Sequence, residues 1–469
     1  MLIGKLYYFI DTKDKIYLSI LFLLAILIGF IELIGVASIV PFIGLLNDPD
    51  YFVDNKYFLM INQYLLFDNE SLVFISGIFL IMSFVLINSL NAYNLWLTTR
   101  YGATLSHKIS MLTKKSYLGQ SYKYFVNADI ASISKNILEE SREYIASCFG
   151  AAPNEITFTS GGTEADNWII KTPFIDKDTS AELTTTQIEH EAVLASAENV
   201  HSKGFNVNFV SCDGEGVTNI DEFKKSINPN TLVASVMYAN NETGVVQPIQ
   251  EMSKIVKDIN PNALFHSDVV QAVATKKLNF HNLGIESAAI SGHKIGGPKG
   301  IGVMFLKTGY KIPSFLHGGK QELERRAGTV NVSGVAGLAA ALKEQQNNLE
   351  KDVELIENEK TIFENYLKEN IELRVVGENV ERLCHISNIQ FKDINSETLM
   401  VALDLNGMGV SRGSACASGA QKPSHVLEAM KVDEQVINNH LRFSFGWNTQ
   451  KGDGEKCAEI VEKTIKELS

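Results

Sequence analysis

Residues 288–306 read Ala-Ala-Ile-Ser-Gly-His-Lys-Ile-Gly-Gly-Pro-Lys-Gly-Ile-Gly-Val-Met-Phe-Leu. Two short apolar runs, Ala288–Ser291 and Gly302–Leu306, flank a glycine-rich turn, and Lys294 lies just beyond the first run. Short apolar runs bounded by turn residues are typical of strands buried in an α/β sheet. A lysine at the end of such a strand suits a Schiff base with a carbonyl cofactor, although a solvated lysine is the commoner role of this residue type.

Similar apolar runs recur along the chain, with helical stretches between several of them. They are 156–159, Leu183–Gln187, Asn206–Val210, Leu232–Tyr238 and Ala263–His266. This alternation predicts an α/β domain with a large, mostly parallel sheet over residues 138–345. From 346 to 469 we expect a smaller α+β domain. Its predicted elements are a long charged helix over Lys343–Asn370, strands near Leu373 and over Ile386–Phe391, and a terminal helix.

The bulk composition excludes several classes of protein. The net charge of −12 over 469 residues gives no basic field for nucleic acid. Five cysteines are scattered without a C-x-x-C pair, which argues against a zinc site or a disulfide framework and favours free thiols in a reducing compartment. They are Cys148, Cys212, Cys384, Cys416 and Cys457. No Walker phosphate loop occurs in the sequence.

Cys416 differs from the other cysteines in its surroundings. It lies in Gly413-Ser414-Ala415-Cys416-Ala417-Ser418-Gly419, a run of small residues that suits a thiol on a mobile, sterically open loop. A thiolate is a strong nucleophile when it is accessible. Together with Lys294, this run favours a pyridoxal-phosphate (PLP) enzyme that passes a group to a thiol.

Polar residues follow several predicted strands, at the edge of an α/β sheet that binds ligands. The segment Ser160-Gly161-Gly162-Thr163 leaves a strand and enters a helix, so its amides and the Thr163 hydroxyl could bind phosphate. Alternatively, Thr163 only caps the helix. His190 follows another strand, where its ring could stack on a cofactor or serve a structural purpose.

Two further charged residues have similar alternatives. Asp268, with Gln271 one turn later, follows a strand and could pair with a protonated pyridine nitrogen or cap a helix. Arg442 is a single charge inside an apolar strand. It could bind a substrate carboxylate, or it could form a structural ion pair.

From about residue 138 to its end, the chain resembles the cysteine desulfurases, PLP enzymes of fold type I in the class-V aminotransferase superfamily. The matching runs are ITFTSGGTEADN, IEHEAV, NNETGVVQPI, HSDVVQA, SGHKIGGPKGIGVMF, HGGKQELERRAGTVNV, SRGSACASG and LRFSFG. The resemblance implies conversion of L-cysteine to L-alanine, with sulfur held on Cys416 as a persulfide for iron–sulfur clusters or tRNA thiolation. A selenocysteine lyase or aminotransferase of the same fold is the alternative.

The resemblance also implies a role for each matching residue, and it implies no metal. Lys294 would hold PLP and move the substrate's α-proton, His190 would stack on the ring, and Cys416 would take the sulfur. The other cofactor-binding residues would be Gly162, Thr163, Ser291 and His293 at the phosphate, Asp268 at the ring nitrogen, Gln271 at the ring oxygen, and Thr329 reaching across a homodimer. Asn241 and Arg442 would bind the substrate carboxylate.

The N-terminal part is apolar. Ile16–Leu46 carries Glu32 as its only charge, and Leu72–Thr99 is uncharged. Each exceeds the roughly 20 residues that cross a bilayer, which predicts a transmembrane hairpin of two helices, about 16–46 and 72–97. A pair of buried core helices is the alternative. Basic residues flank both outer ends, so the catalytic part is expected at the cytoplasmic face of an inner or plasma membrane.

Residues 1–137 resemble the start of an ABC exporter membrane domain, mainly in RYGATLSHKISMLTKKSYLGQSYKYFVNADIASISKNILEE, which runs to residue 140. The desulfurases usually begin with a strand like Y-L-D-N-A-A-T-T and an Asn-Pro loop, and neither is found here. The chain is therefore expected to be a fusion with lowered cofactor affinity or turnover. An inactive fusion is a further alternative.

Overall fold

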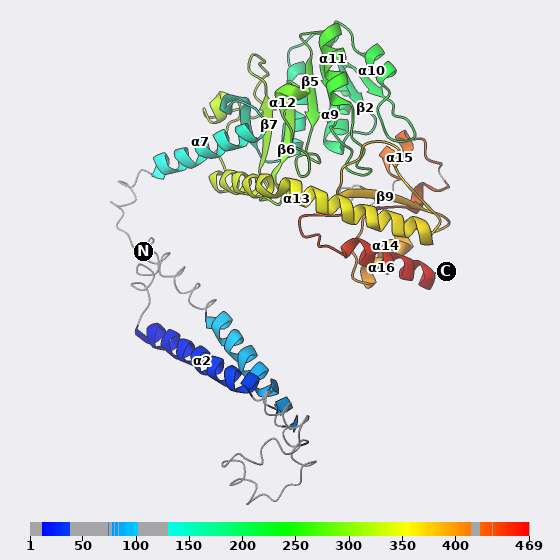
Figure 1. The fold of residues 1–469 in the computed structure, drawn as a ribbon. Coiled ribbons are helices and arrows are strands. Elements are labelled where there is room, and N and C mark those ends of the chain that lie inside the picture. Colours follow the sequence, from blue (N-terminus) through cyan, green and yellow to red (C-terminus); the bar gives the residue numbers. More distant parts are fainter. Residues whose placement is uncertain are drawn as a thin grey trace, which may run out of the picture. The chain divides into compact units, whose positions relative to one another are not determined.

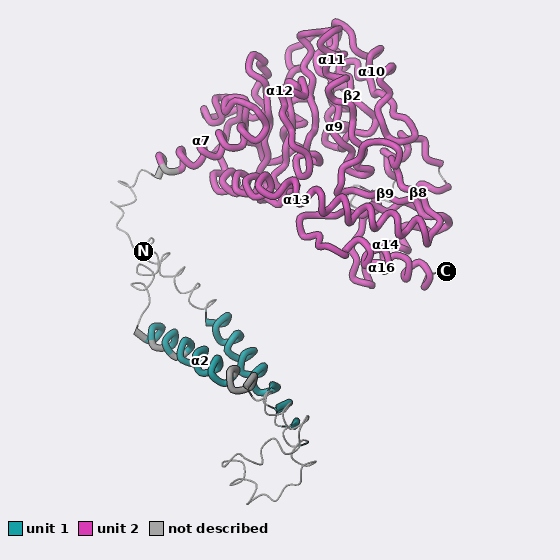
Figure 2. The backbone as a smooth tube through the Cα atoms, in the orientation of Figure 1, with its two compact units in different colours: residues 1–129 teal, residues 130–469 magenta. Residues whose placement is uncertain are grey.

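The computed structural model describes residues 12–37, 74, 77–78, 80–82, 84–101, 130–413, 423–433 and 435–468. The chain divides into two compact units, residues 1–129 and 130–469 (Figure 2). The second unit begins with helix α7 (Ile130–Cys148), whose Ile145 and Ala146 are fully buried in the core of that unit. The boundary predicted from the sequence, 137/138, falls inside α7.

The second unit contains a seven-stranded sheet in the order β1-β7-β6-β5-β4-β2-β3. The strands are β1 (Ile156–Thr159), β2 (Glu182–Thr186), β3 (Asn206–Val210), β4 (Thr231–Ser235), β5 (Leu264–Asp268), β6 (Ser287–Ser291) and β7 (Gly302–Leu306). Neighbours from β3 to β6 pair in parallel, and β7 runs antiparallel to both β6 and β1. The predicted large, mostly parallel sheet is confirmed.

Helices cover both faces of this sheet (Figure 1). One face packs against α8 (Gly162–Lys171) and α9 (Glu191–Ser202). Trp168 of α8 and Leu183 of β2 are fully buried in this layer. The other face packs against α7, α10 (Ile220–Ser226), α11 (Ile249–Ile259) and the first part of α13 (Val332–Asn370). Short elements complete this part. They are η1 (Pro153–Glu155), η2 (Thr172–Phe174), α12 (Phe280–Leu283), η3 (Gly292–Ile295) and η4 (Glu322–Glu324).

A smaller three-stranded antiparallel sheet in the order β10-β9-β8 follows α13. Its elements are β8 (Leu373–Val375), β9 (Ile386–Phe391), α14 (Ser396–Leu405), α15 (His425–Ala429), η5 (Ile437–Asn439), β10 (His440–Ser444) and α16 (Asp453–Leu468). Phe363 and Leu367 of α13 are buried in its core, whereas Val335 and Leu338 are buried against the large sheet. One continuous helix therefore contributes to both cores.

The predicted start of this long helix was wrong. The predicted helix begins at Lys343, but α13 begins at Val332 and is 39 residues long. Gly334 and Gly337 lower the intrinsic helix propensity of the first turns. The structure uses the small size of Gly337, because a Cβ there would lie 2.5 Å from Pro298 Cγ. Close packing against the glycine-rich turn therefore compensates for the low propensity.

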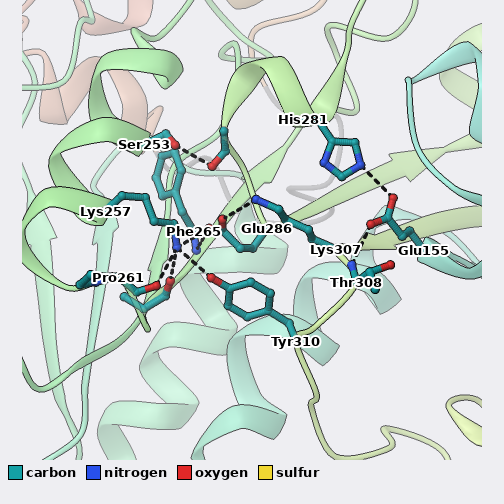
Figure 3. A network of polar contacts seen from close by, with 12 residues as sticks. Glu155, Ser253, Lys257, Pro261, Phe265, His281, Glu286, Lys307, Thr308 and Tyr310 are labelled. Atoms are coloured by element: carbon teal, nitrogen blue, oxygen red, sulfur yellow. Dashed lines mark hydrogen bonds and ion pairs between the residues drawn. The ribbon is translucent and has the colours of Figure 1, made fainter.

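A network of buried carboxylates holds the edge of the sheet where β5 and β6 begin (Figure 3). Glu286 accepts the amide of Phe265 at 3.1 Å and pairs with Lys257 at 2.9 Å. Glu155 accepts the amide of Thr308 at 2.7 Å and bonds His281. Because these contacts satisfy the buried charges, they stabilise this edge of the sheet. The parallel strands end at the opposite edge.

The described part of the first unit consists of two helices, α2 (Thr12–Ala37) and a second helix among residues 74–101. Over Lys13–Ile31 and Leu80–Tyr101 they are long and apolar enough to cross a membrane. Tyr101 Oη donates to the Asp14 carbonyl at 3.3 Å, and the rings of Tyr17 and Tyr101 lie 4.6 Å apart. The two helices therefore run antiparallel. The predicted stretch 38–46 lies outside the described residues.

Candidate active site

A cavity of about 200 Å³ lies at the edge where the parallel strands end. It gathers ten predicted residues from six separate segments: Gly162, Thr163, His190, Asn241, Asp268, Gln271, Ser291, His293, Lys294 and Arg442. Asp268 and Ser291 end β5 and β6, and His190 precedes α9. The predicted position of the site, outside the carboxyl ends of the strands, agrees with this arrangement.

One end of the cavity is built to receive an anion. Helix α8 begins at Gly162, so the amides of its first turn have no partner within the helix. The Ser291 hydroxyl lies 2.9 Å from His293 Nδ1. Burial, followed by the charges of Lys294 and Lys299, lowers the pKa of His293, so its ring is neutral at neutral pH. Thr163 is the second residue of α8, and Gly161, rather than Thr163, occupies the cap position.

Glycine is needed where β7 approaches the strand-to-helix turn. A Cβ on Gly302 would lie 2.5 Å from Gly161 Cα and 2.6 Å from the Ile290 carbonyl oxygen. A Cβ on Gly162 would lie 2.8 Å from Val270 Cγ2, another residue that lines the cavity. The glycines let the start of α8 pack against the ends of β6 and β7, which brings its amides to the cavity.

The cavity is also lined by a buried carboxylate, that of Asp268. Asp268 Oδ1 accepts the Val270 amide at 2.9 Å. Burial raises the pKa of Asp268, while the charges of His190 and Lys294 act in the opposite direction. His190 Nδ1 accepts the Ala192 amide at 3.1 Å, which fixes the plane of its ring. A cationic ring nitrogen next to Asp268 would keep this carboxylate ionised.

Arg442, on β10, lies between the two sheets. Its Nη1 donates to the Asn241 carbonyl at 2.9 Å, but its buried Nε has no hydrogen-bond partner among the described residues. A buried guanidinium donor without a partner is costly. The open Nε therefore favours a carboxylate ligand at this position over the structural ion pair that the sequence left as the alternative.

Asp166 and His266 were missed by the sequence analysis. Asp166 lines the cavity, and its Oδ1 lies 3.2 Å from His266 Nε2, with both side chains buried. Burial, together with the charges of Asp268 and Glu189, raises the pKa of Asp166, and burial lowers that of His266 to about 3. Burial therefore favours the uncharged form of both side chains.

Glu189, just before His190, is a second buried acid that the sequence did not single out. Its Oε1 accepts the Thr186 hydroxyl at 2.9 Å and the Met237 amide at 2.8 Å. Burial raises its pKa from 4.5 to about 8. The folded state therefore keeps a proton that the unfolded chain loses. The protonated Glu189 therefore stabilises the folded state fully at pH values below its pKa in the unfolded chain. This stabilisation is lost as the pH rises through its pKa in the folded state.

We expect Glu189→Gln to become increasingly more stable than the wild type as the pH rises from about 5 to about 8, by up to a few kcal/mol. Glutamine keeps an oxygen for Thr186 and Met237 but cannot ionise. Urea unfolding of both proteins without added cofactor, at several pH values, measures the difference. Glu191→Gln, at an exposed neighbouring position, is the control. A pH-independent difference between Glu189→Gln and the wild type would contradict a neutral Glu189.

A larger cavity of about 640 Å³ adjoins the site and shares Asn241, Gln271, Lys294 and Arg442 with it. Its outer wall includes Trp447, which is 82% exposed. The two cavities together give a small substrate a route from solvent to Lys294.

Two predicted residues are not among the described residues that line this cavity. Thr329 is exposed and does not line it, so its expected reach across a dimer stays a prediction. Cys416 lies outside the described residues. The described neighbours of its segment are close to the site, because Ser411 forms an isolated bridge with Arg442.

The site residues fit PLP in their chemistry. PLP has a phosphate, a pyridine nitrogen and an aldehyde carbon. The site offers the start of a helix for the anion, a carboxylate for the nitrogen and a lysine for the aldehyde. The unpartnered Nε of Arg442 can donate a hydrogen bond to the carboxylate of an amino acid. The fold and the site thus define a PLP-dependent enzyme of fold type I.

Comparison with known proteins agrees with this class. The class-V aminotransferase family matches residues 114–456. The chain is 37% identical over 341 residues to the cysteine desulfurase IscS of Dictyoglomus turgidum, covering 71% of this chain and 85% of that one. It is 38% identical over 339 residues to the putative cysteine desulfurase IscS 1 of Bacillus subtilis, covering 72% and 89%.

A solved NifS-like protein superposes with a TM-score of 0.68 at 30% identity, covering 73% of this chain and 91% of that one. The chain belongs to the class-V aminotransferase family, within its cysteine desulfurase group. Members of this family use PLP. The family expectation of the sequence analysis is therefore confirmed for the second unit. The exporter-like character of residues 1–137 stays a prediction.

Proposed function

We propose that this chain is an L-cysteine desulfurase that releases L-alanine and holds the sulfur on Cys416. The observation that carries the proposal is the assembly of ten predicted residues around one cavity. PLP, when bound, draws electron density from the substrate's α-carbon. The phosphate would be held by Thr163, Ser291, His293 and the first amides of α8, and the ring by His190, Asp268 and Gln271.

The chain's own residues supply binding and proton transfer. Arg442 Nε, together with Asn241, would bind the substrate carboxylate and so aim the α-carbon at Lys294. Lys294, which borders both cavities, would remove the α-proton and later return a proton to the product. The burial of Asp166 and His266 beneath the site keeps bulk water from that side.

In the sulfur step, the Cys416 thiolate would attack the substrate sulfur. An S–S bond forms, the Cβ–S bond breaks, and its electron pair stays on the carbon, which takes a proton to give alanine. L-Cysteine and the Cys416 thiol thus become L-alanine and the Cys416 persulfide. The carbon is reduced and the transferred sulfur is oxidised, so no external oxidant is needed. An acceptor thiol then removes the sulfur.

The four described cysteines are poor candidates for this step. Burial raises the thiol pKa of each of them, that of Cys212 to about 11. Cys212 and Cys384 are buried, and Cys148 and Cys457 are half-buried. Since the thiolate is the nucleophile, these four would react slowly at neutral pH. This supports Cys416 as the sulfur carrier.

The partners follow from this chemistry. The persulfide must pass to an acceptor, such as an iron–sulfur scaffold protein or a tRNA-thiolating protein, and the exposed Thr329 suits the proposed homodimer. No direct nucleic-acid contact is proposed. The large α/β domain would cover residues 138–345 and the small domain 346–469.

We further propose that the two N-terminal helices, a transporter-like segment, anchor the enzyme at the cytoplasmic face of a membrane. The paired ends of the helices carry Tyr17, Tyr93, Trp96 and Tyr101, and Arg100 lies 5.0 Å from the Trp96 ring. Aromatic and basic side chains gathered at one end suit the bilayer interface. Retention of the chain in carbonate-washed membranes would support the anchor, and its release would contradict it.

The function is tested by incubating the purified full-length chain with L-cysteine, PLP and a reductant. Equal amounts of alanine and sulfide are expected. A chain that binds PLP but forms neither product would contradict the proposal. Turnover far below that of the D. turgidum relative under the same conditions is expected if the N-terminal fusion lowers activity.

A further inference from the structure

Glu242 follows Asn241 in the site and is 2% exposed. Its backbone is held firmly. Asn240 Oδ1 accepts the Glu242 amide at 2.8 Å and the Thr243 amide at 2.9 Å, and Asn388 Nδ2 donates to the Glu242 carbonyl at 3.2 Å. The buried Asn240 also donates to the Ile188 carbonyl at 2.9 Å. The backbone that carries the Glu242 carboxylate is therefore fixed by hydrogen bonds beside the site.

This one carboxylate contacts the chain on both sides of the segment 414–422. On the far side, the Ser424 hydroxyl donates to Glu242 Oε2 at 2.5 Å. On the near side, a Cβ built on Gly413 would lie only 3.0 Å from Glu242 Oε2, so the Gly413 backbone lies against the carboxylate. The two residues are eleven positions apart in sequence, and Glu242 brings them to one point.

The near side is also fixed to the substrate-binding strand. Arg442 N donates to the Ser411 carbonyl at 2.6 Å, and Ser411 N donates to the Arg442 carbonyl at 3.2 Å. The Ser411 hydroxyl donates to the Gly413 carbonyl at 2.9 Å. Gly413 is therefore connected to the backbone of Arg442 through Ser411, and it lies next to Glu242.

Cys416 follows Gly413 by three residues and precedes Ser424 by eight. The two described residues next to Glu242 are therefore the ones on either side of the segment that carries Cys416.

We propose that Glu242 is a positioning residue for sulfur transfer, because its carboxylate bonds Ser424 and lies against Gly413, the described residues on either side of the Cys416 segment. This rests on the proposed function. A displacement of about 1 Å at a reacting centre can cost on the order of 100-fold in rate. Loss of the Glu242 contacts is thus expected to slow persulfide formation without weakening cofactor or substrate binding.

The test compares Glu242→Ala, Glu242→Gln and Ser424→Ala with the wild type, all loaded with PLP. Single-turnover formation of the Cys416 persulfide is followed by peptide mass spectrometry, and cofactor absorbance and cysteine affinity are measured in parallel. We expect a 10- to 100-fold slower persulfide step in Glu242→Ala. Glu242→Gln should recover part of the rate, since its oxygen can still accept from Ser424. Cofactor affinity should be unchanged, and cysteine affinity should not fall, because both Glu242 variants remove a negative charge near Arg442.

Asn395→Ala is the matched control. Ser424 caps α15 as well as contacting Glu242, and Asn395 caps α14 of the same small domain without contact to either end of the segment. Wild-type persulfide formation in Asn395→Ala would show that loss of a cap alone is harmless. Equal slowing in Asn395→Ala and Ser424→Ala, or a normal rate in Glu242→Ala, would overturn the inference. If Glu242→Ala does not bind PLP, Glu242→Gln and Ser424→Ala decide.

The same experiment separates this inference from the function on which it rests. Absence of a Cys416 persulfide in the wild type would contradict the proposed function itself. A wild type that forms the persulfide, with variants that form it equally fast, would leave the function standing and remove only the role of Glu242.

Discussion

Replacing Cys416 with alanine is expected to stop sulfur transfer, lowering alanine formation by on the order of 10³-fold or more, as removal of a covalent nucleophile does. No described cysteine can substitute, because burial raises the pKa of all four thiols. PLP binding should be unchanged, since none of the residues lining the cavity is altered. Alanine is measured by amino-acid analysis and bound PLP by its absorbance.

The control for this variant is Cys457→Ala, which removes a partly exposed thiol from α16. It should behave like the wild type. Normal alanine formation by Cys416→Ala would contradict the proposed mechanism. Amino-group transfer from L-cysteine to a keto acid by the same variant would instead favour an aminotransferase. Preserved turnover of selenocysteine alone would favour a selenocysteine lyase.

Replacing Lys294 with alanine is expected to have the second large effect. It removes both the covalent hold on PLP and the group that moves the α-proton, and loss of the general base alone costs on the order of 10²–10⁴-fold. Borohydride reduction of the loaded wild type should fix PLP to the peptide that contains Lys294. The variant should show no fixed PLP on that peptide and little turnover.

Lys299→Ala is the matched control, because Lys299 is exposed in the same glycine-rich turn. It should keep both the reduced PLP adduct on Lys294 and normal turnover. An adduct on Lys299, or on any lysine outside the cavity, would contradict the assignment of Lys294. Loss of the adduct in both variants would point to a disturbed turn rather than to a specific lysine.

Local sequence signals predicted most of the sheet because buried strands are short apolar runs with turn residues at their ends. They also pointed to Thr163, His190, Asp268, Lys294 and Arg442, since side chains that follow parallel strands share one edge of the sheet. Asn241, Ser291 and His293 were expected only from the family resemblance. The roles of those residues stay predictions. Thr163 illustrates the limit of such signals, because the preceding glycine, and not the threonine, takes the cap position of α8.

The residues that the sequence did not reveal are defined by distant partners. Asp166 lies in an ordinary helical pattern, and its partner His266 is 100 residues away. Glu242 contacts Ser424 across 182 residues. A carboxylate on a helix or in a loop usually faces solvent, so neither had a local signal of burial. The one available hint was that Asp166 is three residues after Thr163, on the same side of the first turn of α8.

The helix α13 has a consequence for how the second unit comes apart. Val335, Leu338 and Leu342 are buried against the large sheet, and Phe363 and Leu367 are buried in the small domain. Because both cores contain side chains of α13, unfolding of one core removes packing that stabilises this helix in the other. Melting of either core should therefore destabilise the other, and damage to the small domain should lower the resistance of the whole unit to proteases.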